Sequence, residues 1–395
     1  MKILRLAKLR VSNLFLFFDT FLYQMLLGMI GLTVPIYANM LGASTFLVGV
    51  IGSTGGLIYS FMPLVSGILC DRLRRKVFVS AALLSYGFLC ILYISVEEPL
   101  FLALVKALES FSAAIFWPAI EALIADSAED GLEKALKRFN ISWSTAMVLG
   151  PLIGGIIINW FSIKAPFILS AITSLSFGFF SLIFVVEYPR KPKVASISKL
   201  KDESRTEGLT VLAFASIFLY SSVIGIITAI FPAYATNLNF LPYEIGLITF
   251  SFAAARAFTF YHALKIELKT GKFGMFFLGS LTLGLASLFT SNTNTVPFFI
   301  VYFLIFGFGA GVSYAVSISV LFRKWEYSRG YAAGVFESLI GLGYFIGPLM
   351  GGTLLEYIPN APYLFTFILS LAVLSVQWLF KHGKNDHPFK FSTHR

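Results

Sequence analysis

Charged residues are scarce in this chain. Only 13% of its 395 residues are Asp, Glu, Lys or Arg, and 57% are hydrophobic, whereas about 25% of the residues in a soluble domain are charged. A chain with this balance cannot cover its apolar side chains in water. The composition therefore excludes an ordinary soluble domain and predicts a polytopic membrane protein.

Cysteine and histidine are also rare. The two cysteines, Cys70 and Cys90, lie in or beside apolar runs and give no disulfide framework, so we expect them to be packing residues. Three of the four histidines fall in the C-terminal tail, so no metal site is expected. The chain also lacks a glycine-rich phosphate loop and a nucleophile motif, so we expect no cofactor and no enzymatic activity.

Long apolar runs make up most of the chain. A spanning helix needs about 20 mostly apolar residues, and such runs start near residues 11, 47, 76, 98, 139, 165, 209, 243, 272, 295, 331 and 361. The first run is too long for a signal peptide and is not followed by a cleavage site, so we expect it to be retained as a spanning helix. The runs predict an all-α protein with twelve transmembrane helices.

One long polar segment, rich in Lys, Ser and Pro, divides these runs into six and six. We therefore expect an N-terminal six-helix bundle at residues 1–187, a cytoplasmic linker at 188–208, a C-terminal six-helix bundle at 209–381 and a cytoplasmic tail at 382–395.

The basic residues predict the orientation. With the N-terminus placed inside, 27 of the 30 Lys and Arg residues fall in cytoplasmic segments and one, Lys164, falls in an external loop. Cytoplasmic loops carry an excess of Lys and Arg, so we expect both termini in the cytoplasm. Because the bases are spread over seven segments, the net charge of +10 does not indicate nucleic-acid binding. Short loops and the lack of extra domains suggest a prokaryotic inner membrane.

The two halves of the sequence repeat each other. Val48-Gly49 recurs 197 residues later as Ile245-Gly246. The motif Gly-Pro-x-x-Gly-Gly occurs at Gly150, Pro151, Gly154 and Gly155 and, at the same offset, at Gly347, Pro348, Gly351 and Gly352. Two six-helix halves related by a parallel repeat are a transporter architecture.

The end of the second run resembles the loop motif of the major facilitator superfamily. That motif runs Gly, three residues, Asp, a base, any residue, Gly, any residue and two bases. The matching residues here are Gly67, Asp71, Arg72, Arg75 and Lys76, while Arg74 replaces the second Gly. With the expected twelve helices and the repeat, the chain is similar to this family over its whole length.

The resemblance implies a cytoplasmic gate. Asp71 would cap the N-terminal end of the eleventh spanning helix, where a carboxylate is favourable by about 0.3–1 kcal/mol. Arg75 would pair with an acid at the end of the fourth helix, for which Asp126 is the candidate. These contacts would hold the cytoplasmic side closed in the outward-open state. For Asp71 the alternative is a solvated acid in a basic loop.

Six ionisable residues fall inside the predicted helices, away from their ends. A charge at the bilayer centre costs about 2.5–3.5 kcal/mol on insertion scales, so these residues should line a watery cavity or pair with one another. The resemblance places the first, fourth, seventh and tenth helices around a cavity, which the second, fifth, eighth and eleventh close. The six residues are Asp19, Lys106, Glu109, Glu121, Arg256 and Glu337.

Helical spacing puts several of these residues on one face. At about 100° per residue, Lys106, Glu109, Trp117 and Glu121 share an arc of roughly 120°, and Lys106 and Glu109 are close enough in sequence to pair. We interpret Glu121, which is nearer the cytoplasmic end, as structural. The expected substrate and proton cavity contains Asp19, Tyr23, Lys106, Glu109, Trp117, Arg256, Glu337 and Tyr344.

Their roles divide by chemistry. Arg256 is a fixed cation that could bind an anionic substrate group or pair with an acid. Asp19 and Glu109 are the best candidates for proton carriers, because a carboxyl group whose surroundings change can load a proton on one side of the membrane and release it on the other. The alternative for all of them is static pairing that holds helices together.

The Gly-Pro-x-x-Gly-Gly motif has two interpretations. Its first copy matches a sequence motif that antiporters of the major facilitator superfamily have in the fifth spanning helix. Its recurrence in the second half favours a packing seam instead, because small residues let helices approach closely.

We therefore expect a monomeric, proton-coupled secondary transporter that moves a small molecule across the lipid bilayer by alternating access, with sodium as the alternative coupling ion. Export of amphipathic or cationic compounds, as by a multidrug antiporter, is the first hypothesis. Uptake or exchange of a small polar or anionic metabolite, favoured by Lys106 and Arg256, is the second, and a sensor or scaffold that transports nothing is the third.

Overall fold

The computed structural model describes residues 2–70, 73–127, 132–187, 203–325 and 329–382, and all regular secondary structure in them is helical. The predicted all-α architecture is confirmed. In chain order, the elements are α1 (Lys2–Met40), α2 (Thr45–Cys70), α3 (Arg75–Ser95), α4 (Pro99–Ser127), α5 (Leu132–Trp160), α6 (Ala165–Phe184), α7 (Glu203–Gly225), the π-helical turn η1 (Ile226–Ile230), α8 (Phe231–Asn237), α9 (Pro242–Thr290), α10 (Val296–Lys324), α11 (Arg329–Tyr357) and α12 (Ala361–His382).

Eleven stretches of the described residues are long and apolar enough to cross a membrane. Large apolar side chains such as Phe88, Ile172 and Ile368 are exposed on the outside of the helices, where lipid tails would cover them. The chain is a multi-span integral membrane protein.

The helices begin and end at the polar breaks in the sequence. Proline lies in the first turn of α4, α6, α9, α10 and α12, where its missing N–H removes no helical hydrogen bond. At the start of α9, the Leu241 N–H donates to the Glu244 carboxylate over 2.8 Å. Such local features explain why the helix ends could be predicted from the sequence.

Helix α9 joins two of the predicted runs. Its 49 residues would extend about 74 Å at 1.5 Å per residue, more than twice the roughly 30 Å of a bilayer core. The element consists of two helical segments that meet at a kink, where Gly271 has φ 68° and ψ 171°. Glycine adopts this positive φ without strain. The basic segment at residues 265–272, expected to be a loop, is therefore helical up to this kink.

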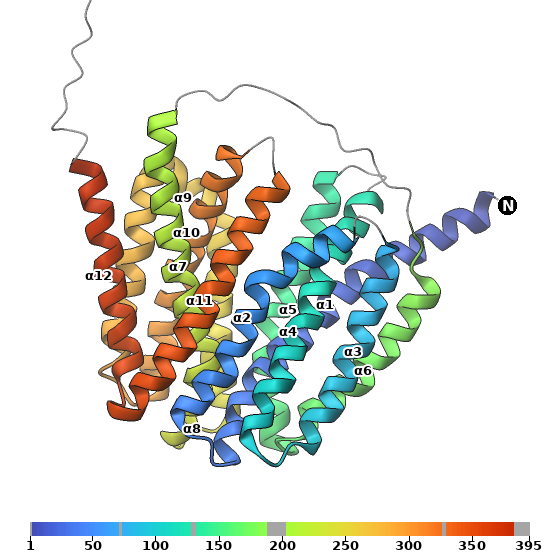
Figure 1. The fold of residues 1–395 in the computed structure, drawn as a ribbon, viewed down its shortest axis with the longest axis horizontal. Coiled ribbons are helices and arrows are strands. Elements are labelled where there is room, and N and C mark those ends of the chain that lie inside the picture. Colours follow the sequence, from blue (N-terminus) through green and yellow to red (C-terminus); the bar gives the residue numbers. More distant parts are fainter. Residues whose placement is uncertain (1, 71–72, 128–131, 188–202, 326–328, 383–395) are drawn as a thin grey trace, which may run out of the picture.

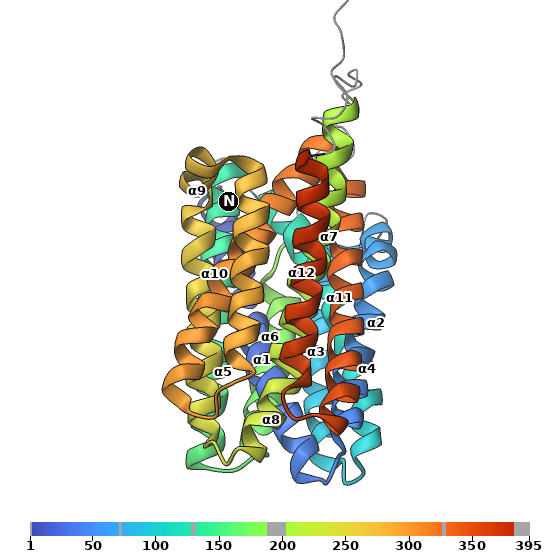
Figure 2. The ribbon, with the colours of Figure 1, turned by 90° about the vertical axis from the view of Figure 1, so that its left-hand side faces the viewer.

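Helices α1–α6 lie on one side of the molecule and α7–α12 on the other (Figures 1 and 2). We call these the N-terminal and C-terminal sides. The main contacts between them are those of α2 with α11 and of α5 with α9. Helices α3, α5, α7 and α11 begin at the end that also holds the start of α1. We call it the basic end, because Arg74–Lys76, Lys137–Arg138 and Arg323–Lys324 lie there; the other is the opposite end.

Two pairs of glycines join the two sides near the opposite end. A Cβ added to Gly352 of α11 would lie 2.7 Å from the Cα of Gly49 in α2, and one added to Gly246 of α9 would lie 3.3 Å from the Cα of Gly155 in α5. Only glycine allows helices to approach this closely without rearrangement. In the repeat, Gly49 corresponds to Gly246 and Gly155 to Gly352, so each contact is the counterpart of the other.

The other glycines of the two motifs pack within their own side, whereas the prolines contact both sides. A Cβ added to Gly246 would lie 2.9 Å from the Pro151 carbonyl oxygen, and one added to Gly49 would lie 2.5 Å from that of Pro348. Pro151 contacts Gly28 of α1, and Pro348 contacts Gly225 of α7. Gly225 follows Gly28 at the same offset of 197 that relates the two prolines. The motifs thus act as packing seams. The remaining contacts are Gly150 with Met25, Gly154 with Met29, Gly347 with Ser222 and Gly351 with Ile226.

We expect Gly352→Ala to destabilise the protein. The added methyl group would lie 2.5 Å from the Thr45 carbonyl oxygen, so α2 and α11 would have to separate. Overpacking of this kind costs about 1–3 kcal/mol, of which the better helix propensity of alanine offsets about 1 kcal/mol. Thermal unfolding of the purified protein in detergent should show a lower melting temperature.

The matched control is Gly31→Ala, because a Cβ at Gly31 would meet nothing within 4 Å. This variant should melt at or above the temperature of the unmodified protein. If the Gly352→Ala and Gly31→Ala proteins are equally stable, the close contact of α2 with α11 is not needed.

Candidate functional site

A cavity of about 1010 Å³ lies between the two sides of the molecule. Its lining extends toward the basic end, to Ile68 on α2, Phe139 on α5 and Phe322 on α10. At the opposite end the glycine pairs join the two sides, and Asn39 donates to the Asn237 side-chain oxygen over 3.0 Å. The sides are therefore joined at the opposite end. Helices α2 and α11 also stay in contact toward the basic end, where the Ser338 hydroxyl donates to the Ser60 carbonyl oxygen over 3.0 Å and a Cβ added to Gly334 would meet the Leu64 side chain.

Lys106 and Glu109 of α4 form an ion pair on the cavity wall. The Lys106 Nζ lies 2.7 Å from Glu109 Oε1, and the Tyr93 hydroxyl of α3 donates to Glu109 Oε2 over 2.7 Å. The pairing that their sequence spacing indicated is present. Because the charge of Lys106 is compensated on its own helix, Lys106 is not a free cation for a substrate.

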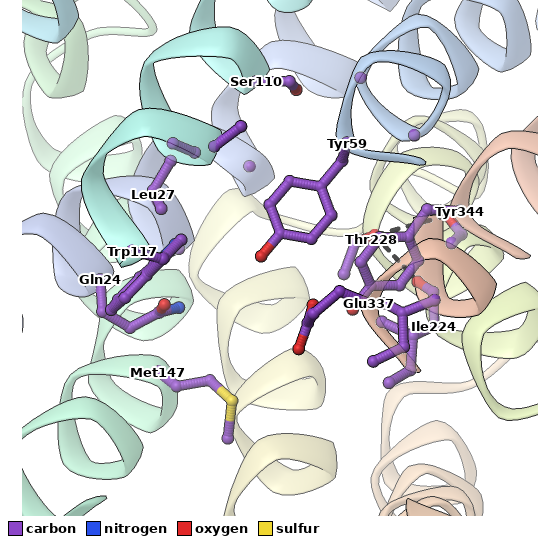
Figure 3. A pocket seen from close by; sticks show the side chains of 18 of the residues that line it. Gln24, Leu27, Tyr59, Ser110, Trp117, Met147, Ile224, Thr228, Glu337 and Tyr344 are labelled. Atoms are coloured by element: carbon purple, nitrogen blue, oxygen red, sulfur yellow. Dashed lines mark hydrogen bonds between the residues drawn. The ribbon is translucent and has the colours of Figure 1, made fainter. Parts of the chain in front are cut away.

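Two further carboxylates face the cavity from opposite sides, Glu121 on α4 and Glu337 on α11. The Tyr59 hydroxyl of α2 points toward the Glu337 carboxylate (Figure 3). Neither acid has a basic partner among the residues that the structure describes. Like charges repel strongly where water is scarce, so a proton or a cationic group beside them would stabilise the pair.

Arg256 lines the cavity from α9, with only 7% of its surface exposed. Its Nη1 donates to the Tyr220 hydroxyl over 3.3 Å, its Nη2 contacts the Met147 sulfur of α5, and its guanidinium carbon lies 5.2 Å from the centre of the Phe252 ring. Within the described part of the chain, its Nε has no hydrogen-bond partner and no carboxylate pairs with it. Arg256 is thus a buried cation without a counter-ion.

Aromatic side chains form much of the remaining wall. Trp117 and Tyr344 lie where the sequence placed them, and Trp117 faces Tyr59 and Glu337 across the cavity (Figure 3). Sequence reasoning missed Tyr59, Tyr220 and Tyr314. The only available signal was that the resemblance placed their helices around the cavity, and this does not single them out among 17 tyrosines.

Asp19 and Tyr23 do not line the cavity, which differs from the expectation. Asp19 is fully buried between α1 and α6, where the Ser181 hydroxyl donates to its Oδ2 over 2.6 Å. Tyr23 packs against α4, with its ring 4.0 Å from that of Phe116. The face of α1 that reaches the cavity instead carries Gln24, Leu27, Gly28 and Gly31. Asp19 and Tyr23 share one helical face, so a single error of orientation misplaced both.

At the basic end, Arg75 and Asp126 form the ion pair that the resemblance implied, linking the start of α3 to the end of α4. Gly67 lines the cavity nearby. Asp71 and Arg72 lie outside the described residues.

Glu187 is a further residue of this region that sequence reasoning passed over. The backbone N–H groups of Arg75 and Lys76 donate to its two carboxylate oxygens over 3.0 and 3.1 Å. A carboxylate at a helix N-terminus satisfies free N–H groups and interacts favourably with the helix dipole. Glu187 thus ties the segment after α6 to the start of α3.

Two helical sides that enclose a cavity with charged side chains in its wall, within a membrane, define a transporter architecture. The family model of the Major Facilitator Superfamily matches residues 16–323 and 212–394. The chain belongs to this family, as the sequence motifs indicated. It is a membrane transporter and not an enzyme.

Three curated relatives align over most of their length. The chain is 25% identical to an uncharacterized MFS-type transporter of Methanocaldococcus jannaschii, over 95% of this chain and 99% of that one. It is 25% identical to multidrug resistance protein 1 of Bacillus subtilis, over 88% and 92%, and 22% identical to the proton-coupled antiporter flippase LtaA of Staphylococcus epidermidis, over 91% and 93%.

Solved structures show the same fold. A mutant of the nucleoside transporter NupG matches with a TM-score of 0.79 at 14% identity, over 93% of this chain and 99% of that one. A bacterial homologue of the human lysosomal transporter Spinster, crystallised inward-facing and unoccupied, matches with a TM-score of 0.78 at 13% identity, over 95% and 97%.

Removing Lys106 alone should destabilise the protein more than removing both charges of its pair. Loss of one partner of a buried ion pair costs about 3–5 kcal/mol because the other charge is left uncompensated; the cost is smaller here, since the Lys106 side chain is 19% exposed. Lys106→Met should therefore lower the melting temperature more than Lys106→Met combined with Glu109→Gln, which can still accept from Tyr93. If the double variant melts lower than the single variant, the pair does not behave in this way.

Replacement of Glu187 should loosen the start of α3. In Glu187→Ala the N–H groups of Arg75 and Lys76 lose their acceptors, so hydrogen–deuterium exchange of peptides covering residues 73–80 should become faster. Glu98→Ala, at an exposed position of the opposite end, is the control and should leave these peptides unchanged. Equal exchange in both variants would mean that Glu187 does not hold this end of the helix.

Proposed function

We propose that this chain is a proton-driven secondary transporter that exports amphipathic compounds by alternating access, as a multidrug antiporter does. In this proposal α9 crosses the membrane twice, which makes twelve spans in two six-helix bundles, residues 1–187 and 209–381. Residues 188–208 link the bundles, and residues 382–395 form a tail. The excess of bases at the basic end supports placing it, with both termini, in the cytoplasm.

Proton coupling rests on one observation: Glu121 and Glu337 face the same cavity from the two sides that would move relative to each other. A proton shared near the two acids relieves their repulsion while they are close. When the sides rock apart, the repulsion falls and the proton is released. The printed name of one relative, a proton-coupled antiporter flippase, supports this mode of coupling.

The cavity wall supports an amphipathic, cationic substrate. Apolar and aromatic side chains dominate the lining, and the volume is that of a site for drug-sized ligands, about 300–1,000 Å³. Three acids, Glu109, Glu121 and Glu337, outnumber the two bases, Lys106 and Arg256. The similarity to a multidrug resistance protein supports the same class.

The basic-end contacts support a gate. Arg75, Asp126 and Lys76, with Gly67, Asp71 and Arg72 of the same motif, would close the cytoplasmic side in the outward-open state. In this proposal the protein works as a monomer in a prokaryotic inner membrane. The archaeal and bacterial sources of two relatives support the prokaryotic membrane.

A second candidate function is uptake or exchange of a small anionic metabolite. The uncompensated charge of Arg256 favours it, because an anion would supply the missing counter-ion. Lys106, the other base that favoured this function, is already paired with Glu109. We therefore place export first.

Transport by inverted membrane vesicles tests the proposal. When respiration acidifies their lumen, vesicles containing the protein should accumulate ethidium, and a protonophore should abolish the accumulation. Glu337→Gln should reduce accumulation to the level of vesicles without the protein, because an amide cannot carry a proton. Glu356→Gln, an exposed position on the same helix, should transport normally.

Other outcomes would favour the alternatives. Accumulation that resists the protonophore but needs a sodium gradient would replace protons by sodium. Movement of a labelled organic anion without movement of ethidium would favour metabolite transport. Full activity of Glu337→Gln would remove the basis for coupling through this acid.

A further inference from the structure

Arg256 is a buried charge that the proposed proton coupling does not use. It is held in place by side chains of three elements: Tyr220 of α7, Met147 of α5 and Phe252 of its own helix. A buried cation without a counter-ion is costly, and the protein could have avoided this cost with an uncharged residue. The position of Arg256 on the cavity wall suggests that a solute supplies the opposite charge.

The contacts of Arg256 leave room for a strong acceptor. A guanidinium group has five N–H donors. Of its contacts, only the Tyr220 hydroxyl is an ordinary acceptor, since a thioether sulfur accepts weakly and an aromatic ring offers only its face. Nε has no partner among the described residues. An oxyanion can accept from two N–H groups of an arginine at once, and it would satisfy this group fully.

The cavity also contains uncompensated negative charge. The carboxylates of Glu337 and Glu121 line it and have no basic partner within the described chain. Arg256 and Glu337 line this cavity together with Tyr220 and Tyr344, yet they form no ion pair with each other. A positive and a negative charge thus line one cavity together with aromatic side chains.

We propose that the transported compound is a zwitterion with an aromatic body. Its oxyanion binds Arg256 beside Tyr220, its cationic group lies by Glu337 and Glu121, and its aromatic part packs on Tyr344. A simple cation would leave Arg256 uncompensated, and a simple anion would leave the two acids uncompensated. This inference rests on the proposed function and narrows its substrate class from amphipathic cations to amphipathic zwitterions.

The competing explanation needs no oxyanion. Arg256 and Glu337 lie on helices of the C-terminal side, and another conformation of the transporter could bring them together as an ion pair. In that case Arg256 serves the conformational cycle, and a ligand carboxylate gains nothing from it. The two explanations differ in how a ligand carboxylate affects affinity.

Two dyes with the same ring system separate these explanations. Tetramethylrhodamine carries a delocalised cation and a free carboxylate, while its methyl ester carries the cation alone. Their dissociation constants are measured at pH 7.5 by fluorescence anisotropy on the full-length protein in detergent. We expect the free acid to bind about tenfold more tightly than the ester, as one charge-assisted hydrogen-bonded contact provides.

Three variants test which residue causes the preference for the free acid over the ester. Arg256→Gln should bind both dyes equally, with the ester affinity unchanged, and Arg256→Lys, which keeps the charge but not the fork of donors, should show an intermediate preference. Glu337→Gln should weaken both dyes by the same factor and keep their ratio. Size-exclusion chromatography and melting temperature establish that each variant is folded, and the comparison of dyes on the unmodified protein stands without any variant.

Several results would overturn the inference. Equal affinities for the two dyes on the unmodified protein would do so, as would a preference that survives Arg256→Gln. A preference for the acid that appears only in Glu337→Gln, in which Arg256 has lost its internal partner, would support the internal ion pair instead. Binding of the ester without any preference for the acid removes this inference alone, whereas failure of both dyes to bind removes the proposed amphiphile transport and this inference with it.

Discussion

Close approach of backbones at glycine is the constraint on which the rest of this structure depends. Between helices in a membrane there is no hydrophobic driving force, because lipid tails are as apolar as the side chains, so association relies on van der Waals packing and on satisfied polar groups. Gly49 against Gly352 and Gly155 against Gly246 bring α2 to α11 and α5 to α9 at the opposite end. The cavity lies between the two sides that these contacts hold together.

The repeat preserves this packing but not the chemistry of the cavity. At the offset of 197 that relates the packing glycines, Arg256 corresponds to Tyr59 and Glu337 corresponds to Asn140. All four residues line the cavity. Corresponding positions in the two halves therefore face the cavity in both. The backbone frame is thus symmetric, whereas the charges placed on it are not. An asymmetric set of charges in a symmetric frame is what a site for an asymmetric molecule requires.

Much of the fold and part of the site follow from the sequence, for reasons that can be stated residue by residue. Apolar runs and prolines marked the helix ends, and the spacing of Lys106 and Glu109 predicted their pairing, because these features are local. The break near Gly271 was expected, because a new apolar run starts near residue 272, but the helical course of residues 265–270 was not, because a short basic stretch can form either a loop or the end of a helix. Asp19 was misplaced because a polar side chain can avoid lipid in two ways: it can face a cavity, or it can pack between helices of one side, as Asp19 does against Ser181. Periodicity alone does not distinguish these faces.

The two charged poles of the cavity lie on the same helix pairs that join the sides. Glu337 of α11 lies by Tyr59 of α2, and Arg256 of α9 contacts Met147 of α5. Any movement that opens one end and closes the other must shift α2 against α11 and α5 against α9. The surroundings of both poles must then change with it, because each pole is held in part by the other side. The glycine contacts that shape the cavity therefore also couple its charges to the motion that transport requires.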